Sequence, residues 1–441
     1  MKTRWAAIIL TFLICACSVQ IYDLQPLMPT ETVMIRRNTP TLYIPIATEA
    51  PFVHAAATAE PIAAPTEIVS AISAEILELT MIDGGTGWGI GQIPGEEARM
   101  ILRTTDGGSS WKDLTPRTAL EENKGRTVNV SAYFSDANHA WVIYWEPVSW
   151  QPDKGVQVWL TADAGANWER IELPISGYTL QYFRNPEIGF TDNQIGWIFA
   201  KLGNSEGRTF YGLYTTFDGG RNWNPVVTPD TGNLSSANIR NGAVFRDALE
   251  GWISGENNFE DPSSMLWHTQ DGGATWVTQT LPVPEIEGIP ADIFSASNYS
   301  CSLSTPKFVD FQYQYAYTVL NCEGGELEEP VSVLYWSYDS LSTWRTKKLP
   351  KAEGNLTFYG IDRGWYSVTA DPGADQPYEI LTTVDGGDSW NVSAYPAWDS
   401  RLQFITAAVG FGVVNYQGHL ALVRTGDGGV SWNQLYPLIL P

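Results

Sequence analysis

Residues 101–111 read ILRTTDGGSSW, and the last eight of them decide the fold because they return six more times along the chain. Every copy of this octapeptide begins with Thr or Ser, has Asp at its third position and ends in Trp. The copies are TTDGGSSW (Asp106, Trp111), TADAGANW (Asp163, Trp168), TFDGGRNW (Asp218, Trp223), TQDGGATW (Asp271, Trp276), SYDSLSTW (Asp339, Trp344), TVDGGDSW (Asp385, Trp390) and TGDGGVSW (Asp427, Trp432). Successive aspartates lie 42 to 68 residues apart, a spacing that brackets the blade lengths of β-propellers.

Two further features keep phase with the octapeptide. A small residue followed by an aromatic residue stands upstream of each copy: Gly87-Trp88, Ala140-Trp141, Gly196-Trp197, Gly251-Trp252, Ala316-Tyr317, Gly364-Trp365 and Gly410-Phe411. A proline follows five or six residues after each octapeptide Trp: Pro116, Pro174, Pro229, Pro282, Pro350, Pro396 and Pro437. Three features in phase over seven copies indicate a true internal repeat.

Each repeat contains four short stretches with the patterning of β-strands, which in the second repeat are 130–134, 140–145, 156–161 and 168–173. A single four-stranded sheet cannot bury both of its faces, so the repeats must stack radially. The sequence therefore predicts an all-β, seven-bladed β-propeller of four-stranded antiparallel blades over residues 76–441. The sequence does not decide how the ring closes. Each blade can be self-contained, or residues 66–73 can add a strand to the last blade.

The residues of the octapeptide suit a tight turn. The Asp side chain can accept hydrogen bonds from backbone N–H groups, the Gly two places later permits a positive φ, and the Trp can pack beneath the turn. The octapeptide resembles the Asp-box, which in the families that carry it lies on the outer part of each blade. This resemblance implies that the seven aspartates are structural and not catalytic. In the fifth copy Ser340 and Leu341 replace the usual glycines, so we expect a distorted turn there.

The N-terminus indicates export and lipid anchoring. Lys2 and Arg4 form a positively charged start and precede an apolar run at 5–14. This run has the length of a signal peptide and is too short to span a membrane. The following Ile14-Cys15-Ala16-Cys17 resembles the bacterial lipobox, which implies a signal peptide at 1–16 and a lipid on Cys17. We expect an exported protein anchored through Cys17 at the outer face of the cytoplasmic membrane or at the cell surface. An ordinary signal peptide cut nearby is the alternative.

The segment that follows differs in composition from the repeats. Between residues 18 and 73 seven prolines are scattered among Thr, Ala and Glu, with no Trp and no Gly. No strand or helix period persists, so residues 17–75 are predicted to be a disordered, semi-rigid tether.

Two cysteines remain after Cys17, and export permits them to form a disulfide. Cys301 and Cys322 flank the turn that we expect between two antiparallel strands at 307–311 and 315–321. Residues opposed across such a pair lie close enough to be bonded, so the sequence predicts a Cys301–Cys322 bridge.

Composition and motifs exclude several classes of function. The formal net charge of −23 repels phosphate backbones, so nucleic acid is not an expected partner. The four histidines, at 54, 139, 268 and 419, are dispersed without metal-ligand spacing, and neither a G-x-S-x-G nor a P-loop motif is present. No metal and no cofactor are therefore expected.

A carbohydrate-active protein remains open. Sialidases use an arginine triad, a Tyr–Glu pair and an early Arg-Ile-Pro motif, for which Phe183-Arg184-Asn185-Pro186 is a poor substitute. Nothing in the sequence makes three of Arg103, Arg240, Arg246 and Arg424 converge. Trp145 and Trp150 can form a sugar-stacking platform or cover blade edges. The insertion at 283–305, with Glu285, Glu287 and Asp292, is the place where we expect a partner contact.

With these features assembled, the chain resembles the photosystem II stability/assembly factor-like propellers, which are lipid-anchored, seven-bladed and built from a nearly identical unit. Residues 101–111 match that unit almost letter for letter, and the resemblance covers residues 76–437. It implies a non-catalytic scaffold that binds protein partners, with a glycoside hydrolase or a lectin as the alternative. This chain departs from the family in its acidic balance, since those factors resemble one another in carrying a basic patch.

Overall fold

The computed structural model describes most of the part of the chain that carries the repeats. The described residues are 72–122, 128–146, 155–175, 182–205, 208–229, 231, 234, 239–257, 263–296, 298–416 and 418–440. Cys17, His54, Trp150 and the tether up to residue 71 lie outside them. Within these described ranges no helix has the length and hydropathy needed to cross a bilayer.

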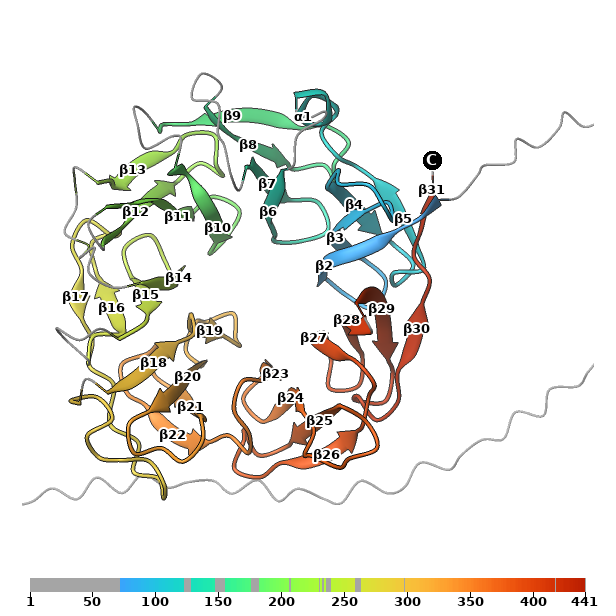
Figure 1. The fold of residues 1–441 in the computed structure, drawn as a ribbon. Helices are drawn as coiled ribbons and strands as arrows, with labels where there is room; N and C mark the ends of the chain where they lie inside the picture. Colours follow the sequence, from blue (N-terminus) through green and yellow to red (C-terminus); the bar gives the residue numbers. More distant parts are fainter. Residues whose placement is uncertain are drawn as a thin grey trace, which may run out of the picture. The chain divides into compact units, whose positions relative to one another are not determined.

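Seven sheets, each with four antiparallel strands, stand around a central axis, so the chain forms a seven-bladed β-propeller (Figure 1). The strands nearest the axis are β2 (Glu75–Met81), β6 (Asn129–Phe134), β10 (Arg184–Phe190), β14 (Arg240–Phe245), the pair β18 (Tyr299–Leu303) and β19 (Lys307–Phe308), β23 (Asn355–Tyr359) and β27 (Asp399–Phe404). The second strands are β3 (Gly87–Gln92), β7 (Ala140–Trp145), β11 (Gly196–Ser205), β15 (Gly251–Gly255), β20 (Ala316–Gly324), β24 (Arg363–Thr369) and β28 (Gly410–Tyr416).

The two outer positions complete each blade. The third strands are β4 (Met100–Thr104), β8 (Val156–Thr161), β12 (Arg208–Thr216), β16 (Leu266–Thr269), β21 (Val331–Ser337), β25 (Tyr378–Thr383) and β29 (His419–Thr425). The outermost strands are β5 (Ser110–Asp113), β9 (Glu169–Leu173), β13 (Asn224–Val227), β17 (Val277–Thr278), β22 (Arg345–Lys348), β26 (Asn391–Ala394) and β30 (Asn433–Leu435). A short helix that the sequence did not predict, α1 (Arg117–Glu122), connects the first two blades. The predicted fold class is confirmed, and the four predicted strands of the second blade are correct to within one residue.

The small residue upstream of each octapeptide leaves room for a side chain at the end of the innermost strand, or one residue before that end in the sixth blade. The two residues are direct cross-strand partners in all seven blades: Met81–Gly87, Phe134–Ala140, Phe190–Gly196, Phe245–Gly251, Phe308–Ala316, Phe358–Gly364 and Phe404–Gly410. A Cβ atom added to Gly196 would lie 2.5 Å from the ring of Phe190. The small residue is therefore a packing requirement.

The aromatic residue beside it joins neighbouring blades. In six successive blade pairs its ring contacts the Phe at the end of the innermost strand of the next blade, or one residue before that end in the sixth blade. The ring-centroid distances are 5.3 Å for Trp88–Phe134, 3.8 Å for Trp141–Phe190, 5.3 Å for Trp197–Phe245, 6.0 Å for Trp252–Phe308, 5.0 Å for Tyr317–Phe358 and 3.4 Å for Trp365–Phe404. Aromatic pairs of this kind contribute roughly 0.5–1.5 kcal/mol each beyond the area that they bury. One such pair lies at each of the six successive blade junctions from the first blade to the seventh.

The ring closes through the C-terminus. β31 (Leu438–Leu440) pairs in parallel with β5, the outer edge of the first blade, and β1 (Ile72–Ser73) pairs with β31. The side chain of Gln403 binds the backbone N–H and C=O of Met81 at 2.7 and 3.0 Å, which joins the innermost strands of blades 7 and 1. The ring is thus closed by a C-terminal strand that joins the sheet of the first blade. The alternative, an N-terminal strand added to the last blade, is not observed in the described residues. The first blade's sheet also begins at Ile72, four residues before the boundary predicted at 76.

The predicted disulfide is present in the fifth blade. Cys301 on β18 and Cys322 on β20 are direct cross-strand partners with a Cα–Cα distance of 4.1 Å, and both are buried. The strand predicted at 307–311 is present only as the short β19, which pairs with β20 as expected but does not carry Cys301. Cys301 lies on β18, a segment that precedes the expected strand, because the innermost position of this blade is divided between β18 and β19.

Candidate functional site: the turn face and the channel mouth

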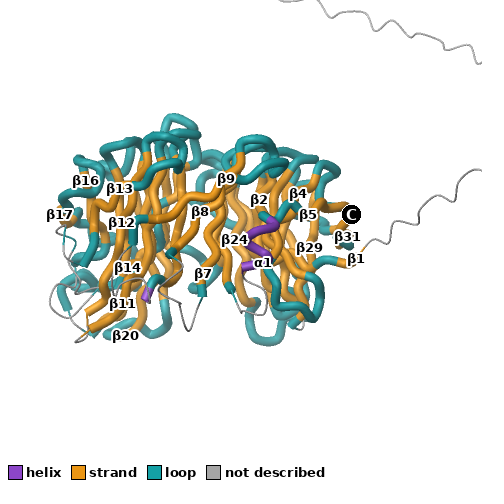
Figure 2. Tube along the Cα trace, turned by 90° about the horizontal axis from the view of Figure 1, so that it is seen from above, coloured by secondary structure: helices purple, strands orange, loops and turns teal. Residues whose placement is uncertain are grey.

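The strands run between two loop-bearing faces of the ring, as the side view in Figure 2 shows. One face, which we call the turn face, carries the turns from first to second strand and the octapeptide turns from third to outermost strand. Hydrogen bonds from Trp141 Nε1 to Gly219 O and from Trp365 Nε1 to Gly428 O, both 2.8 Å, join the second strand of one blade to the octapeptide turn of the next. The opposite face, the loop face, carries the remaining connections.

The octapeptide turns share one pattern of hydrogen bonds. In the last copy, Thr425 Oγ1 donates to Asp427 Oδ1 at 2.8 Å and accepts the N–H of Gly429 at 3.0 Å. The side chain and the backbone N–H of Ser431 donate to the same carboxylate, and these bonds hold the pKa of Asp427 at about 2. The equivalent bonds occur in the other six copies. Each octapeptide carboxylate is therefore ionised and bonded within its own turn.

The expected distortion of the fifth turn is wrong. Ser340 and Leu341 adopt positive φ angles of 56° and 65°, as the glycines do elsewhere, and the hydrogen bonds of Asp339 are unchanged. Leu341 is fully buried and packs in the core between blades 4 and 5 with Trp252 and Tyr335. Burial of the leucine side chain offsets the cost of its left-handed backbone.

A second set of aspartates on the turn face was missed in the sequence. Five turns from first to second strand each contain an Asp whose side chain accepts backbone N–H groups two to five residues later: Asp83, Asp136, Asp192, Asp247 and Asp310. A signal was available, since in the second, third and fourth blades this Asp stands two residues after a Phe and four before the small residue. In every blade the residue after the octapeptide Asp donates its N–H to this neighbouring turn.

One of these turns extends over the channel. Residues 309–315, which we call the knob loop, connect β19 to β20 in the fifth blade. The hydroxyl of Tyr313 donates to the backbone oxygen of Thr191 at 2.8 Å, which lies in the corresponding turn of the third blade. The loop therefore passes the fourth blade at the inner edge of the turn face. At its tip Phe311 is 98% exposed.

A carboxyl group with a raised pKa lies on an innermost strand. Glu187 on β10 accepts the N–H of Ala243 on β14 at 3.2 Å, and a Cβ atom on Gly242 would lie 2.5 Å from its Oε2. Surrounding protein raises the pKa of Glu187 to about 7 although the side chain contacts solvent. Burial also raises the pKa of Glu78 on β2, an effect that Arg401 opposes.

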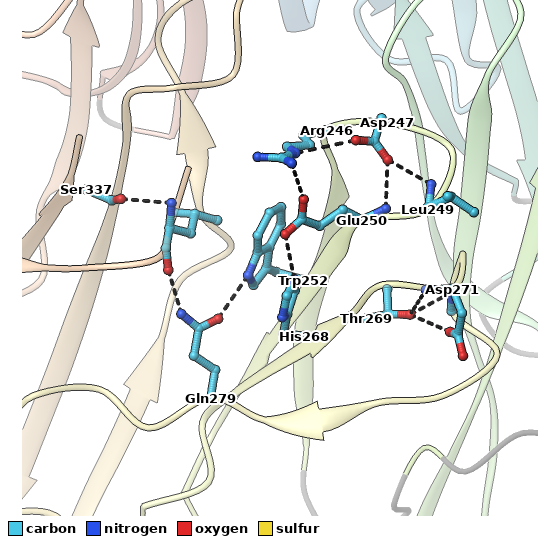
Figure 3. Close-up of polar contacts among 12 residues, drawn as sticks. Arg246, Asp247, Leu249, Glu250, Trp252, His268, Thr269, Asp271, Gln279 and Ser337 are labelled. Atoms are coloured by element: carbon cyan, nitrogen blue, oxygen red, sulfur yellow. Dashed lines mark hydrogen bonds and ion pairs between the residues drawn. The ribbon is translucent and has the colours of Figure 1, made fainter. Parts of the chain in front are cut away.

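A polar network joins the fourth and fifth blades at the irregular octapeptide (Figure 3). Glu250 binds His268 Nε2 at 2.9 Å and forms an ion pair with Arg246. Trp252 Nε1 donates to Gln279 Oε1 at 3.0 Å, and Gln279 Nε2 donates in turn to the backbone oxygen of Leu341 at 2.5 Å. Gln279 thus bridges the two blades, whereas Trp141 and Trp365 bond the octapeptide turn of the next blade directly.

The arginines considered for a sialidase-like site do not converge. Each makes its own local contacts: Arg103 lies over Trp88 and donates to the backbone oxygen of Ala137, Arg240 lies over Trp267, Arg424 lies over Phe411, and Arg246 pairs with Asp247 and Glu250. Among the described residues no three His, Cys, Asp or Glu side chains gather as metal ligands. Trp145 is buried and donates to Ser131, so it covers the blade interior and offers no sugar platform.

Of the predicted insertion at 283–305, residues 283–296 lie on the loop face between the fourth and fifth blades, whereas Tyr299–Leu303 form the innermost strand β18. Its apolar residues Ile289, Ile293 and Phe294 are buried in the core between these blades. Glu285, Glu287 and Asp292 are exposed, which leaves the predicted partner contact there untested.

Two cavities border the blades away from the axis. One of about 570 Å³ lies at the outer edge between blades 1 and 2, lined by Arg103, Lys112, Asp163 and Leu440 among others. Another of about 200 Å³ lies on the loop face beside Cys322, lined by the acidic residues Glu256, Glu323 and Glu353.

The chain matches no family model and no curated protein by sequence. Its structure is similar to that of YCF48 from Cyanidioschyzon merolae, at 17% identity over 80% of this chain and 96% of that one, with a TM-score of 0.47. A GH74 xyloglucanase from Xanthomonas campestris matches at 12% identity over 84% of this chain and 55% of its own, with a TM-score of 0.48. A prolyl endopeptidase matches at 10% identity over 84% and 50%, with a TM-score of 0.50. At such identities the likeness shows the propeller fold alone.

Proposed function

We propose that this chain is a non-catalytic scaffold, an exported lipoprotein whose propeller binds a membrane protein complex and helps it to assemble. The observation that carries the proposal is the turn face, a surface of hydrogen-bonded turns on which apolar side chains stand exposed. The carboxylates of these turns are engaged in holding the backbone, so they are poor candidates for acid–base chemistry. Exposed apolar side chains on a rigid surface are typical of protein contacts.

The N-terminal sequence supports a position at the membrane surface. A lipid on Cys17 would anchor the chain, and the proline-rich segment that follows would hold the propeller at a distance from the bilayer. The resemblance of residues 101–111 to the repeat unit of the assembly factor-like propellers agrees with this role. The acidic balance of this chain favours a partner with a basic surface.

Affinity purification of the full lipidated chain from its own membranes in mild detergent tests the proposal. The matched control is the tether alone, residues 17–75, carrying the same lipid. We expect one discrete membrane protein complex to be retained by the full chain and to be absent from the tether control. Recovery of glycans with no stable protein partner would contradict the scaffold.

A carbohydrate-active role is the second candidate, and Glu187 is the observation that favours it. A carboxyl group with a pKa near 7 can act as a general acid in glycoside cleavage. If the chain releases sugar ends from a polysaccharide and Glu187→Gln abolishes the release, this candidate replaces the scaffold.

A further inference from the structure

We propose that the turn face is the protein-docking surface, and that Phe311 inserts into an apolar pocket of the partner protein whose border carries lysine or arginine side chains. This inference rests on the proposed scaffold function and specifies the face, the central residue and the chemistry of the partner.

The knob loop is held in place by contacts at both of its ends. Val309 donates its N–H to the backbone oxygen of Tyr315 at 2.9 Å, and the Asp310 carboxylate accepts the N–H of Tyr315 at 2.8 Å. Tyr313 packs edge-on against Phe308 at 5.2 Å and bonds Thr191 across the fourth blade. Tyr313 adopts a positive φ of 53°, which these contacts maintain.

The other aromatic residues of this region have roles inside the molecule. Phe308 contacts Trp252 of the fourth blade, and Tyr315 packs edge-on against Tyr338. Phe311 differs from them because 98% of its surface is exposed. A side chain presented by a braced loop loses little conformational entropy on binding, and an aromatic ring supplies a large contact area. These are the properties of a binding anchor.

Single exposed apolar side chains are normal, so the neighbours of Phe311 matter. Four further large apolar side chains stand in the turns of this face with 55% to 64% of their surface exposed: Phe217, Leu249, Val384 and Val430. Together with Phe311 they come from blades 3, 4, 5, 6 and 7 in unbroken succession. The turn face therefore offers apolar contacts on five consecutive blades, with Phe311 nearest to the channel.

The negative charge of the turn face indicates which residues should surround the partner's pocket. The same turns carry two sets of aspartates, and hydrogen bonds lower the pKa of the octapeptide carboxylates such as Asp385 and Asp427, so they are ionised. Two basic residues of this region are already paired, Arg221 with Glu169 and Lys347 with Asp388. A partner with lysine or arginine around an apolar pocket complements this pattern, whereas an anionic membrane surface is repelled.

A photo-reactive benzophenone amino acid placed at position 311 of the full chain, in its own cells, tests the inference. The control carries the same group at Tyr395, which is 57% exposed and follows the outermost strand of blade 6 on the loop face. We expect one discrete adduct from position 311, with at least tenfold lower yield from position 395. The linked peptide of the partner should contain lysine or arginine beside apolar residues.

The affinity of the purified partner for variants of the chain then measures the contribution of Phe311 to binding. Phe311→Ala should weaken binding about 30-fold, as expected for a central aromatic anchor, whereas Tyr395→Ala should leave it unchanged. Both residues are exposed, so unchanged thermal unfolding of the variants shows that the fold is intact.

Several results would overturn the inference. These are an adduct to phospholipid or to a second copy of this chain, equal yields from both positions, or unchanged affinity of Phe311→Ala. If position 311 gives no adduct while the full chain still retains a membrane complex, the scaffold stands and this docking surface is wrong. If no complex is retained either, both proposals fail.

Discussion

At the scale of single residues, the octapeptide turns show which side chains a left-handed backbone position can accept. Two octapeptides place a residue other than glycine at a left-handed position, Ala164 with φ 59° and Ser340 with φ 56°. Neither residue is buried, so neither gains the packing that compensates Leu341. Packing therefore does not compensate the strain of the left-handed backbone at these two positions.

Ser340→Gly and Ala164→Gly should each stabilise the protein by about 0.5–1 kcal/mol. Glycine removes the strain of the left-handed backbone, and this gain exceeds the loss that comes from the greater conformational entropy of glycine in the unfolded chain. Chemical denaturation of each variant measures the change. Ser342→Gly in the same turn is the control, since Ser342 has no positive φ, and it should be neutral or destabilising. Destabilisation by Ser340→Gly would show that strain is not relieved there.

Glu187 predicts a pH dependence. Because its folded pKa of about 7 lies above the ordinary value of 4.5, the folded state holds a proton that the unfolded state has lost between these values. This group therefore makes stability fall as pH rises from about 4.5 to 7. Glu187→Gln should raise stability at pH 8 by on the order of 1 kcal/mol, after allowance for solvent in the channel, and have no such effect at pH 4. Equal effects in thermal unfolding at both pH values would contradict the assignment.

At the scale of elements, closure depends on three residues at the C-terminus. In β31 only the central residue faces the core: Ile439 is 7% exposed and packs with Trp111 and Leu422, whereas Leu438 and Leu440 are more than 40% exposed. Ile439→Asp should destabilise the protein by about 3 kcal/mol because it buries a charge in this core. Leu440→Asp changes the same strand at an exposed position and should cost less than about 0.5 kcal/mol. Similar losses from both substitutions in denaturation would argue against this closure.

The disulfide stabilises the divided inner strand of the fifth blade. The two cysteines are 21 residues apart, for which loop-closure entropy predicts about 3 kcal/mol. The double variant Cys301→Ser/Cys322→Ser should lose this stability, and reductant should lower the stability of the wild type but not that of the variant. A wild type that is insensitive to reductant under denaturing conditions would contradict the bond.

Between residues and elements, the sequence predicted most features that repeat or pair, and it missed contacts between residues far apart in the chain. The seven blades, their strand order and the cysteine bridge follow from features that recur or pair. A turn was expected at the knob loop, but its contact with the third blade could not be predicted, since the bond from Tyr313 to Thr191 joins residues 122 positions apart. Ring closure by residues 438–440 was also hidden, because a three-residue strand has no pattern of its own. The Phe-x-Asp signal was readable and was overlooked.

At the scale of the whole molecule, the ring presents two different surfaces to possible partners. The loop face carries an insertion whose apolar residues are used to pack blades 4 and 5. The turn face has repeated, hydrogen-bonded turns that carry ionised aspartates and exposed apolar side chains. A rigid face of this kind suits a scaffold better than a catalyst, because its carboxylates are bonded to backbone.

Sedimentation of native membrane extracts in mild detergent tests the scaffold claim most directly. The full chain has a mass of 48.8 kDa, and the account predicts that it sediments within one discrete, heavier complex. Leu440→Asp should remain in that complex, whereas Ile439→Asp, with its ring weakened, should leave it. A wild-type chain that sediments alone, at the size of a single detergent-bound copy, would contradict the claim that the propeller acts by binding other proteins.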